Sequence, residues 1–386
     1  MTAADAKMPA SKPVLVYVVT EDWYFLSHRL PMARAAHAAG YDVHVITHVN
    51  KGRDAIEAEG FSVHPVVWRR GSLNPLDFVS NIRAVRRVYR AIRPAIVHNV
   101  ALQSAVVGSL AAEGLTFPRL NALAGLGFSF TSNTLKARLV RPVLRALLRH
   151  VLGNRHAAVL VQNPDDRAAI LSLGVPAGKF AIIPGSGVET DHLLPLPEPE
   201  GEVTAAFVGR LLDDKGVRSL IEAHAILARR GTPVRLLIAG DPDPANPVSI
   251  PPDEIASWAR QTGVEVLGHV GDIRAVWRRA HIAVLPSRRE GLPKSLLEAA
   301  ACGRAIVATD VPGCREIARP GVNALLVPVD DAQALADAIG ALAADAALRR
   351  SYGAAGREMV VREFSADKIG RDVVALYDQL LRRQVK

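Results

Sequence analysis

Two glutamates and a lysine stand in one segment, residues 286–303, whose residue types suit a turn followed by a helix. Pro293 suits the first position of that helix, where free backbone amides favour a bound anion such as a diphosphate. Lys294 adds a positive charge beside these amides. Glu290 precedes them and Glu298 lies about one helical turn beyond them, and carboxylates accept hydrogen bonds from pairs of hydroxyl groups. The segment therefore has the chemistry to hold a diphosphate between two hydroxyl-bearing groups.

The strand before this segment explains why its position matters. Residues 282–285 form an apolar run typical of a buried parallel strand, and open α/β sheets bind ligands at the carboxyl ends of such strands. Two glutamates with seven residues between them are common, so the alternative is that Glu298 is a solvated helix residue and Glu290 a loop charge. The strand-to-helix position and the Gly-x-Pro-Lys turn favour a binding site.

Two cationic residues follow another predicted strand. Residues 204–208 are predicted to open a second sheet, and Gly209, Arg210 and Lys215 lie in the loop after it. An arginine and a lysine five residues apart in such a loop can clamp a diphosphate and neutralise charge on a departing nucleotide. The alternative is a solvated loop that caps the next helix.

Three stretches resemble one known family: Glu290–Glu298, Ala300–Gly303 and Val311–Glu316. The first resembles the Glu-x7-Glu signature of retaining glycosyltransferases of family 4 with the GT-B fold. Together they are similar to enzymes that extend undecaprenyl-diphosphate-linked sugars, such as the N-acetylgalactosaminyltransferase of bacterial N-glycosylation. The resemblance is dense in the C-terminal half and patchier before it. It implies an α/β protein with the GT-B fold, in which two Rossmann-like domains face a central cleft.

The resemblance also implies roles for individual residues. Arg210 and Lys215 would stabilise the leaving diphosphate, and Glu298 would hold the ribose. Glu290 would bind hydroxyls of the donor sugar, which His98 would contact from the other domain. The predicted catalytic residues are thus His98, Arg210, Lys215 and Glu290. The predicted nucleotide-sugar-binding residues are Gly209, Arg210, Lys215, His269, Val270, Glu290, Gly291, Leu292, Lys294, Ser295 and Glu298.

The first domain contributes candidates at two predicted strand ends. The strand over residues 14–20 leads into a turn where many relatives carry a pair of glycines, but here the turn is acidic and aromatic. Aromatic faces stack on carbohydrate and carboxylates hold hydroxyls, so this turn is predicted to bind the acceptor sugar; the alternative is an aromatic lid on the core. The predicted acceptor-binding residues are Glu21, Asp22, Trp23 and Tyr24. His98 ends the predicted strand 95–99; a lone histidine is more often a core or surface residue, but the resemblance favours a functional role.

The length of 386 residues exceeds one ordinary core and fits two domains. We expect an acceptor-side Rossmann-like domain over residues 13–188 and a linker over 189–202. The donor-binding domain is expected over 203–362, and a C-terminal helix, 366–381, is expected to cross back onto the first domain.

The charge of +9 is concentrated in one region. Residues 61–155 hold 14 Lys and Arg but only 2 Asp and Glu, which indicates an anionic partner such as a lipid headgroup, a diphosphate or a nucleic acid. A stripe of four arginines on one predicted helix, with leucines beside it, is expected to dock on an anionic membrane surface. The alternative is a crossover helix whose arginines are merely solvated. The stripe consists of Arg138, Arg141, Arg145 and Arg149.

The sequence indicates neither export nor a metal site. Residues 1–12 lack the apolar core of a secretory signal and no later stretch holds 18 uninterrupted apolar residues, so we expect a cytoplasmic protein at the inner face of the cytoplasmic membrane. Cys302 and Cys314 are too few for a disulfide framework and are expected to be structural. Asp241 and Asp243 imitate an Asp-x-Asp metal motif in a proline-rich loop, but a turn is the favoured interpretation. We therefore expect no cofactor and no required metal.

The resemblance implies a retaining transfer of a sugar, an N-acetylhexosamine, from a UDP-sugar to a polyprenyl-diphosphate-linked saccharide in the assembly of surface polysaccharide, lipopolysaccharide or glycoprotein glycans. One alternative is a nucleotide-sugar 2-epimerase of the same fold, which would need acid–base groups at the sugar and no acceptor. An alternative of another class is a basic nucleic-acid-binding protein. That alternative would use the arginines of residues 61–155 and leave the glutamates of the second domain unexplained, so no nucleic-acid partner is expected.

Overall fold

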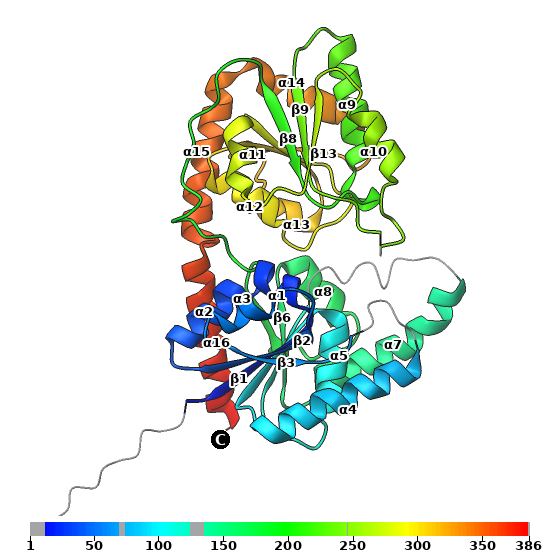
Figure 1. Cartoon of the computed structure of the whole chain (residues 1–386), viewed down its shortest axis with the longest axis vertical. Helices are drawn as coiled ribbons and strands as arrows, with labels where there is room; N and C mark the ends of the chain where they lie inside the picture. Colours follow the sequence, from blue (N-terminus) through cyan, green and yellow to red (C-terminus); the bar gives the residue numbers. More distant parts are fainter. Residues whose placement is uncertain (1–11, 69–73, 124–134, 245, 385–386) are drawn as a thin grey trace, which may run out of the picture. The chain divides into compact units, whose positions relative to one another are not determined.

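The computed structural model describes residues 12–68, 74–123, 135–244 and 246–384, apart from the side chains of Pro75 and of residues 135–141. The chain divides into two compact units (Figure 1). The first unit comprises residues 1–183 together with 370–386, and the second comprises residues 184–369. The boundaries fall before Pro184 and within the last helix.

The first unit is built on a seven-stranded parallel sheet of order β3-β2-β1-β4-β5-β6-β7. The strands are β1 (Val14–Glu21), β2 (Asp42–His48), β3 (Ser62–Pro65), β4 (Ile96–Val100), β5 (Arg119–Ala122), β6 (Ala157–Val161) and β7 (Phe180–Ile182). The central strands are near-continuous apolar runs because parallel sheets are covered on both faces. Every residue of β4, β5 and β6 is buried.

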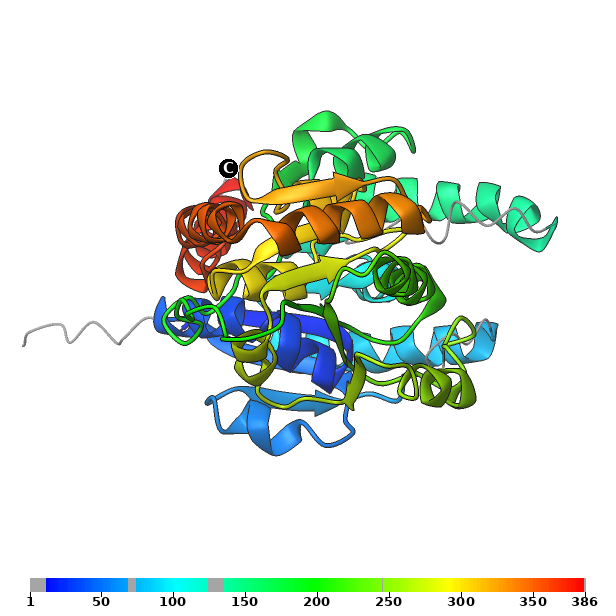
Figure 2. The same ribbon diagram turned by 90° about the horizontal axis from the view of Figure 1, so that it is seen from above.

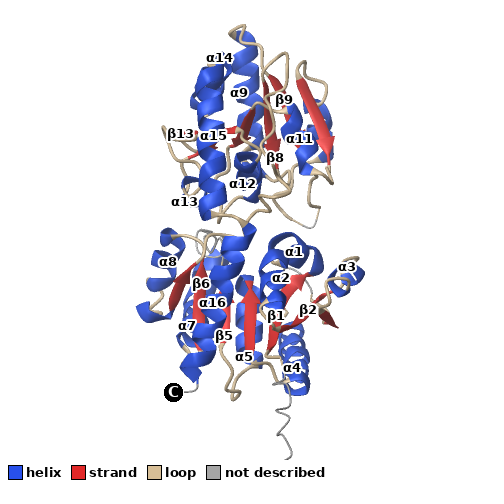
Figure 3. Cartoon of the chain, turned by 90° about the vertical axis from the view of Figure 1, so that its left-hand side faces the viewer, coloured by secondary structure: helices blue, strands red, loops and turns tan. Residues whose placement is uncertain are grey.

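Helices cover this sheet on both faces (Figure 3). They are α1 (Asp22–His28), α2 (Leu30–Ala38), α3 (Arg53–Glu57), α4 (Pro75–Ile92), α5 (Ala101–Ala111), α7 (Leu135–Gly153), α8 (Pro164–Leu171), the 3-10 turn η1 (Ala177–Lys179) and the last helix α16 (Ala366–Gln384). On one face α5 lies between α4 and α7 (Figure 2) and contacts both of them. Helix α4 buries Val85 and Tyr89 and exposes Arg83, Arg87 and Arg90, as its amphipathic pattern predicts.

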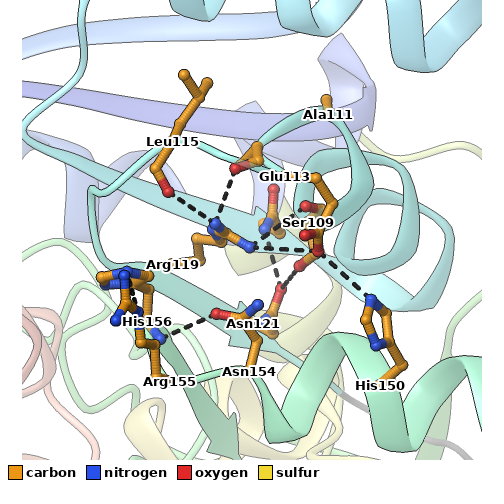
Figure 4. A network of polar contacts seen from close by, with 12 residues as sticks. Ser109, Ala111, Glu113, Leu115, Arg119, Asn121, His150, Asn154, Arg155 and His156 are labelled. Carbon is orange, nitrogen blue, oxygen red and sulfur yellow. Dashed lines mark hydrogen bonds and ion pairs between the residues drawn. The ribbon is translucent and has the colours of Figure 1, made fainter.

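A buried arginine stabilises the end of α5 (Figure 4). Arg119, at the start of β5, donates to the carbonyl of Ala112 at 2.8 Å and to that of Leu115 at 3.0 Å. These carbonyls lie at and just beyond the C-terminus of α5, where the last carbonyls of a helix lack intrahelical partners. Beside it, Asn99 of β4 donates to Asn121 of β5 at 2.9 Å. This polar network joins α5 to the centre of the sheet.

The second unit is built on a six-stranded parallel sheet of order β10-β9-β8-β11-β12-β13. The strands are β8 (Thr204–Val208), β9 (Arg235–Ala239), β10 (Val264–Gly268), β11 (Ile282–Leu285), β12 (Ala305–Thr309) and β13 (Ala324–Val327). The helices are η2 (Asp213–Lys215), α9 (Val217–Arg229), α10 (Pro252–Trp258), α11 (Ile273–Arg279), α12 (Lys294–Ala301), α13 (Pro312–Arg315), α14 (Ala332–Ala344) and α15 (Ala346–Glu363). One hydrophobic core runs through this unit.

The two sheets share one topological feature. In each, the first strand of the unit has as its neighbours the second strand on one side and a later strand on the other, so the connections reverse direction between β1 and β4 and between β8 and β11. Ligands of open α/β sheets bind at the carboxyl ends of the strands at such a reversal. The predicted class, two Rossmann-like α/β domains, is confirmed. Among the described helices, none is both long and apolar enough to cross a membrane.

Candidate functional site

The centre of the candidate site is an ion pair at the reversal between β8 and β11. Lys215 ends the turn η2 after β8, and Glu290 lies in the loop after β11. The ammonium of Lys215 donates to Oε1 of Glu290 at 2.6 Å, and the Ser287 hydroxyl donates to the same oxygen at 2.6 Å. The side chains of Lys215 and Glu290 are 20% and 9% exposed. Among the described residues, no partner is found for Oε2 of Glu290, so only one of the two carboxylate oxygens is held by the protein.

Glycine brings the two loops into contact. Gly216, directly after Lys215, has φ of 69°, a conformation that glycine adopts without strain. A Cβ at this position would lie 2.0 Å from the carbonyl oxygen of Pro286. Any other residue would therefore push the turn that carries Lys215 away from the loop that carries Glu290.

A surface arginine holds the same two loops together and adds a third. Arg288 donates through Nη1 to the Asp213 carboxylate at 2.6 Å and through Nε to the Asp330 carboxylate at 2.8 Å. Its backbone N–H donates to the carbonyl of Asp214 at 2.8 Å. The loop after β11 is thus tied to η2 and to the loop between β13 and α14.

The loop after β11 is also supported from β12 and α13. The hydroxyl of Thr309 donates to the carbonyl of Ser287. A Cβ on Gly313 would lie 2.5 Å from the carbonyl oxygens of both Glu290 and Gly291, so α13 packs directly on the loop. The position of Glu290 is therefore fixed by backbone contacts as well as by its own hydrogen bonds.

The second glutamate lies on α12. This helix begins at Lys294, with Pro293 as its N-cap residue, so the proline lies one position earlier than the sequence predicted. No described side chain caps the first turn, which leaves the amides of Lys294 and Ser295 pointing out of the helix, where an anion is favoured. Glu298 is 12% exposed, and burial raises the pKa of its carboxyl although Lys294 lies 3.4 Å away and opposes the shift. Lys294 is thus paired within its own helix.

Arg210, the other cation predicted to bind the diphosphate, is also paired with a carboxylate. Arg210 donates through Nη1 to Oδ2 of Asp243 at 2.8 Å, and these side chains are 46% and 16% exposed. Gly209 packs so closely on the end of β9 that a Cβ on Gly240 would lie 1.9 Å from its carbonyl oxygen. Arg210 and Lys215 therefore lie in one loop but contact different carboxylates.

Three predicted site residues have a simpler placement. His269 is exposed and Val270 is half-buried against the core, both just after β10, which is separated from β8 by β9. Leu292 packs against the start of the second unit, where a Cβ on Gly185 would lie 2.3 Å from its side chain. In the described part of the chain, no group of three or more His, Cys, Asp or Glu side chains could hold a metal ion.

The predicted acceptor turn spans the end of β1 and the start of α1, and one of its residues is structural. Asp22 is buried, and its carboxylate accepts from the backbone N–H groups of Asn50 at 2.6 Å, of Gly52 at 2.8 Å and of Trp23 at 2.7 Å. These bonds, with a further bond from the Asn50 side chain, hold the pKa of Asp22 below its usual value against the opposing effect of burial. Trp23 remains exposed, and Tyr24 stacks on the ring of His28 at 4.3 Å. Asp22 therefore fixes the loop before α3, and its oxygens are already used.

His98 lies inside β4 and not at its end. It pairs with Tyr17 in the sheet register and is fully buried, which lowers its pKa well below the usual value. Its Nδ1 is 2.6 Å from the hydroxyl of Tyr377 on α16, which is 2.8 Å from the hydroxyl of Tyr17. Two strand residues follow His98, so the expected strand-end position is wrong. Its predicted contact with the donor sugar has no support from this geometry, because no surface of the imidazole is exposed.

Two of the four arginines of the stripe on α7 have side chains that lie outside the described part of the structure. The side chains of Arg138 and Arg141 are not among those described. Arg145 donates to the carbonyl of Ser172 at 2.8 Å, while Arg149 and Val143 are exposed. Helix α7 continues through Pro142.

Sequence reasoning missed the residues that position the ion pair. Ser287 stands three residues before Glu290 in a turn, a spacing that could have suggested its hydrogen bond. Arg288 and Asp243 act across loops that are distant in sequence, and a single sequence carries no signal for such pairs.

Two family models match the chain, one on each unit. The description "Glycosyl transferase 4-like" matches residues 15–163, and "Glycosyl transferases group 1" matches residues 202–345. Together they cover more than half of the chain.

Individual proteins agree with this assignment. The chain is 27% identical, over 93% of its length and 98% of the relative, to an N,N'-diacetylbacillosaminyl-diphospho-undecaprenol alpha-1,3-N-acetylgalactosaminyltransferase of Campylobacter jejuni. It is 26% identical to the putative glycosyltransferase EpsD of Bacillus subtilis, with 96% and 98% covered.

Solved structures show the same fold. Sucrose-phosphate synthase of Thermosynechococcus elongatus superposes with a TM-score of 0.81 at 21% identity, covering 96% of this chain and all of that one. HepE of Anabaena in complex with UDP and glucose superposes with a TM-score of 0.74 at 17% identity, covering 94% and 99%. The chain is therefore a transferase that belongs to the GT4-like glycosyltransferases and has the GT-B fold.

Proposed function

We propose that this enzyme transfers an N-acetylhexosamine from a UDP-sugar to a polyprenyl-diphosphate-linked saccharide, with retention of the anomeric configuration, during the assembly of a surface or protein-linked glycan. The observation that carries the proposal is the Lys215–Glu290 pair at the reversal between β8 and β11, beside the uncapped start of α12. The acceptor class is supported by the activity of the Campylobacter jejuni relative, and the nucleotide by the complex of HepE with UDP.

The second unit supplies the groups that a nucleotide-sugar needs. The amides at the start of α12 and the cations Arg210 and Lys215 would bind the diphosphate and stabilise the negative charge that grows on it as the sugar leaves. Glu298 would accept hydrogen bonds from the ribose hydroxyls, and Oε2 of Glu290 would accept one from the sugar. Cationic stabilisation of a leaving diphosphate requires no metal ion, so we propose a metal-independent transfer.

The proposed chemistry is a same-face displacement at the anomeric carbon. The bond from that carbon to the diphosphate oxygen breaks, and a new bond forms to the acceptor hydroxyl on the same face. The hydroxyl proton passes to an oxygen of the leaving diphosphate, so no protein base is needed. Glu290, which is bonded through Oε1 to Lys215 and Ser287, is held as a hydrogen-bond acceptor in this scheme and not as a nucleophile. No step is assigned to the buried His98.

The acceptor is proposed to bind the first unit and the membrane. Glu21 is the last residue of β1, and Trp23 and Tyr24 follow it in α1, at the edge where this sheet also reverses direction. The exposed arginines of α4 and α7 would bring the unit to anionic headgroups at the inner face of the cytoplasmic membrane, where the lipid-linked acceptor resides.

The test is a panel of UDP-sugars assayed against short-chain and long-chain undecaprenyl-diphosphate saccharides, with and without EDTA. We expect transfer from one UDP-N-acetylhexosamine, an anomeric proton in the product whose coupling matches the donor, and no effect of EDTA. Release of a 2-epimerised sugar without an acceptor would support the epimerase instead. Salt-steep binding to DNA in a gel shift at physiological salt, without transfer, would support the nucleic-acid alternative.

A further inference from the structure

Both cations that the proposed function assigns to the diphosphate are bonded to carboxylates. Glu290 holds Lys215, and it also has a role at the donor sugar. Asp243 holds Arg210 at 2.8 Å but has no role in the proposed reaction. Asp243 is also half of the Asp-x-Asp sequence that the proposed function leaves unused. The question is therefore what a carboxylate does beside a diphosphate site.

The loop that carries Asp243 is anchored to the donor loop. The N–H of Leu211 donates to the carbonyl of Asp241 at 2.9 Å, and the N–H of Asp213 donates to the carbonyl of Val248 at 2.8 Å. The backbone N–H of Asp243 itself donates to the hydroxyl of Ser249 at 2.9 Å. The carboxylate is thus presented to Arg210 from a backbone that is fixed on both sides.

The contact uses one nitrogen of Arg210. A guanidinium has five N–H donors, and among the described residues no partner is found for Nε or Nη2 of this arginine. Arg210 can therefore hold Asp243 and a phosphate oxygen at the same time. Asp243 would direct the guanidinium, but its negative charge would oppose a second anion bound beside it.

We propose that Asp243 is a positioning residue that aims Arg210 at the diphosphate and, through its charge, limits the affinity of the site for a nucleoside diphosphate. This inference rests on the proposed donor role of Arg210. Its consequence is faster release of the product UDP, which retains the diphosphate but no longer has the sugar that Glu290 holds. A site with two unopposed cations would hold UDP more tightly and be inhibited by its own product.

A metal-binding Asp243 would give the opposite result. A carboxylate ligand to a divalent cation helps to bind the diphosphate through that cation, so neutralising it would weaken UDP binding. A carboxylate that opposes the diphosphate weakens binding when it is charged, so neutralising it would strengthen UDP binding. The sign of the change separates the two.

The experiment measures UDP binding by isothermal titration calorimetry, once in buffer with EDTA and once in buffer with MgCl2, using the full chain and two substitutions at Asp243. Asp243→Asn keeps the shape and an acceptor oxygen but removes the charge, and we expect it to bind UDP about two- to fivefold more tightly, the range for an exposed ion pair. The gain should shrink at 0.5 M NaCl because salt screens exposed charges. Asp243→Ala also removes the acceptor, so we expect its kcat to fall below that of Asp243→Asn, since Arg210 is no longer aimed.

Asp337→Asn is the matched control. Asp337 accepts from Arg230 at 2.7 Å in another Asp–Arg pair of the same unit, outside the candidate site, and its substitution should leave UDP affinity unchanged. Unchanged or weaker UDP binding by Asp243→Asn would overturn the inference alone, provided that the wild-type protein binds UDP. A metal-dependent UDP affinity that Asp243→Asn abolishes would overturn it in favour of a metal site. Failure of the wild-type protein to bind UDP would overturn the proposed donor site and this inference with it.

Discussion

Removing Lys215 should destabilise the protein and abolish turnover for two separable reasons. Lys215 and Glu290 form a nearly buried pair, with Nζ and Oε1 2.6 Å apart. Deleting one partner of a buried pair costs roughly 3–5 kcal/mol, because a charge stays buried without its counter-charge. In Lys215→Met the Glu290 carboxylate keeps only the Ser287 bond among those described, but Lys215 is itself partly exposed, so we expect the lower end, about 3 kcal/mol.

The double substitution separates stability from catalysis. Glu290→Gln alone keeps an acceptor for Ser287 and leaves a lysine that can reach solvent, so we expect a loss of about 1 kcal/mol. Lys215→Met with Glu290→Gln removes both charges together. Replacing both partners of a buried pair by neutral groups is often neutral for stability, so most of the loss should be recovered, with a coupling of about 2–3 kcal/mol between the two sites.

Turnover should not recover in the same double substitution. Loss of one group that stabilises transition-state charge costs about 2.7–4 kcal/mol, or on the order of a hundredfold or more in kcat. The assays are urea unfolding at constant ionic strength and transfer of a radiolabelled sugar under saturating donor. Additive losses of stability would refute the structural pair, and recovery of turnover in the double substitution would refute the catalytic role of the lysine.

Three further changes test other parts of the site and fold. Glu298→Gln should weaken UDP binding, yet it should raise the melting temperature at pH 8 more than at pH 5. Burial raises the pKa of the Glu298 carboxyl in the native state, so the wild-type protein loses stability as the pH rises through that pKa. The neutral amide of glutamine removes this loss. Gly216→Ala should lower both kcat and the urea midpoint. Gly231 is the control, because it has the same φ of 69° but no atom near an added Cβ. Gly231→Ala should therefore show only the smaller loss of stability that comes from backbone strain. Tyr377→Phe should lower the free energy of unfolding, measured by urea denaturation, by about 1–3 kcal/mol, because it leaves the buried Nδ1 of His98 without this hydroxyl. Its calorimetric UDP affinity should stay normal. Normal stability with lost UDP binding would contradict that last assignment.

Much of the fold could be predicted from apolar runs. The strands at residues 204–208 and 282–285 have the predicted bounds, because a strand buried on both faces needs a continuous apolar run and its ends are marked by turn residues. The loops that carry Arg210, Lys215 and Glu290 follow from these strand ends. The apolar runs in the sequence therefore predicted which edge of the sheet holds the candidate site.

Side-chain partners could not be predicted in the same way. His98 was placed at a strand end, but β4 continues to Val100, and the partner of His98 is Tyr377, 279 positions away. Asp22 had the chemistry for a sugar hydroxyl, but the N–H groups of a loop that begins at Asn50 use its oxygens. Neither set of partners is specified by a pattern of residue types, because burial depends on packing between distant segments.

The pairing of the cations is a further feature beyond sequence reasoning. The sequence predicts that Arg210 and Lys215 clamp a diphosphate, and in the structure each has a carboxylate within hydrogen-bonding distance. An anion that enters this site must compete with or share these contacts. We therefore expect the affinity of the proposed donor site for an anion to depend on acidic residues as well as on basic ones.

The most direct test of the account is an experimental structure of the protein with UDP bound. We expect the diphosphate at the start of α12 in the second unit, within hydrogen-bonding distance of Arg210 and Lys215, with the ribose hydroxyls on Glu298. UDP bound to the first unit, or to the second unit away from these residues, would contradict the assignment of the donor site.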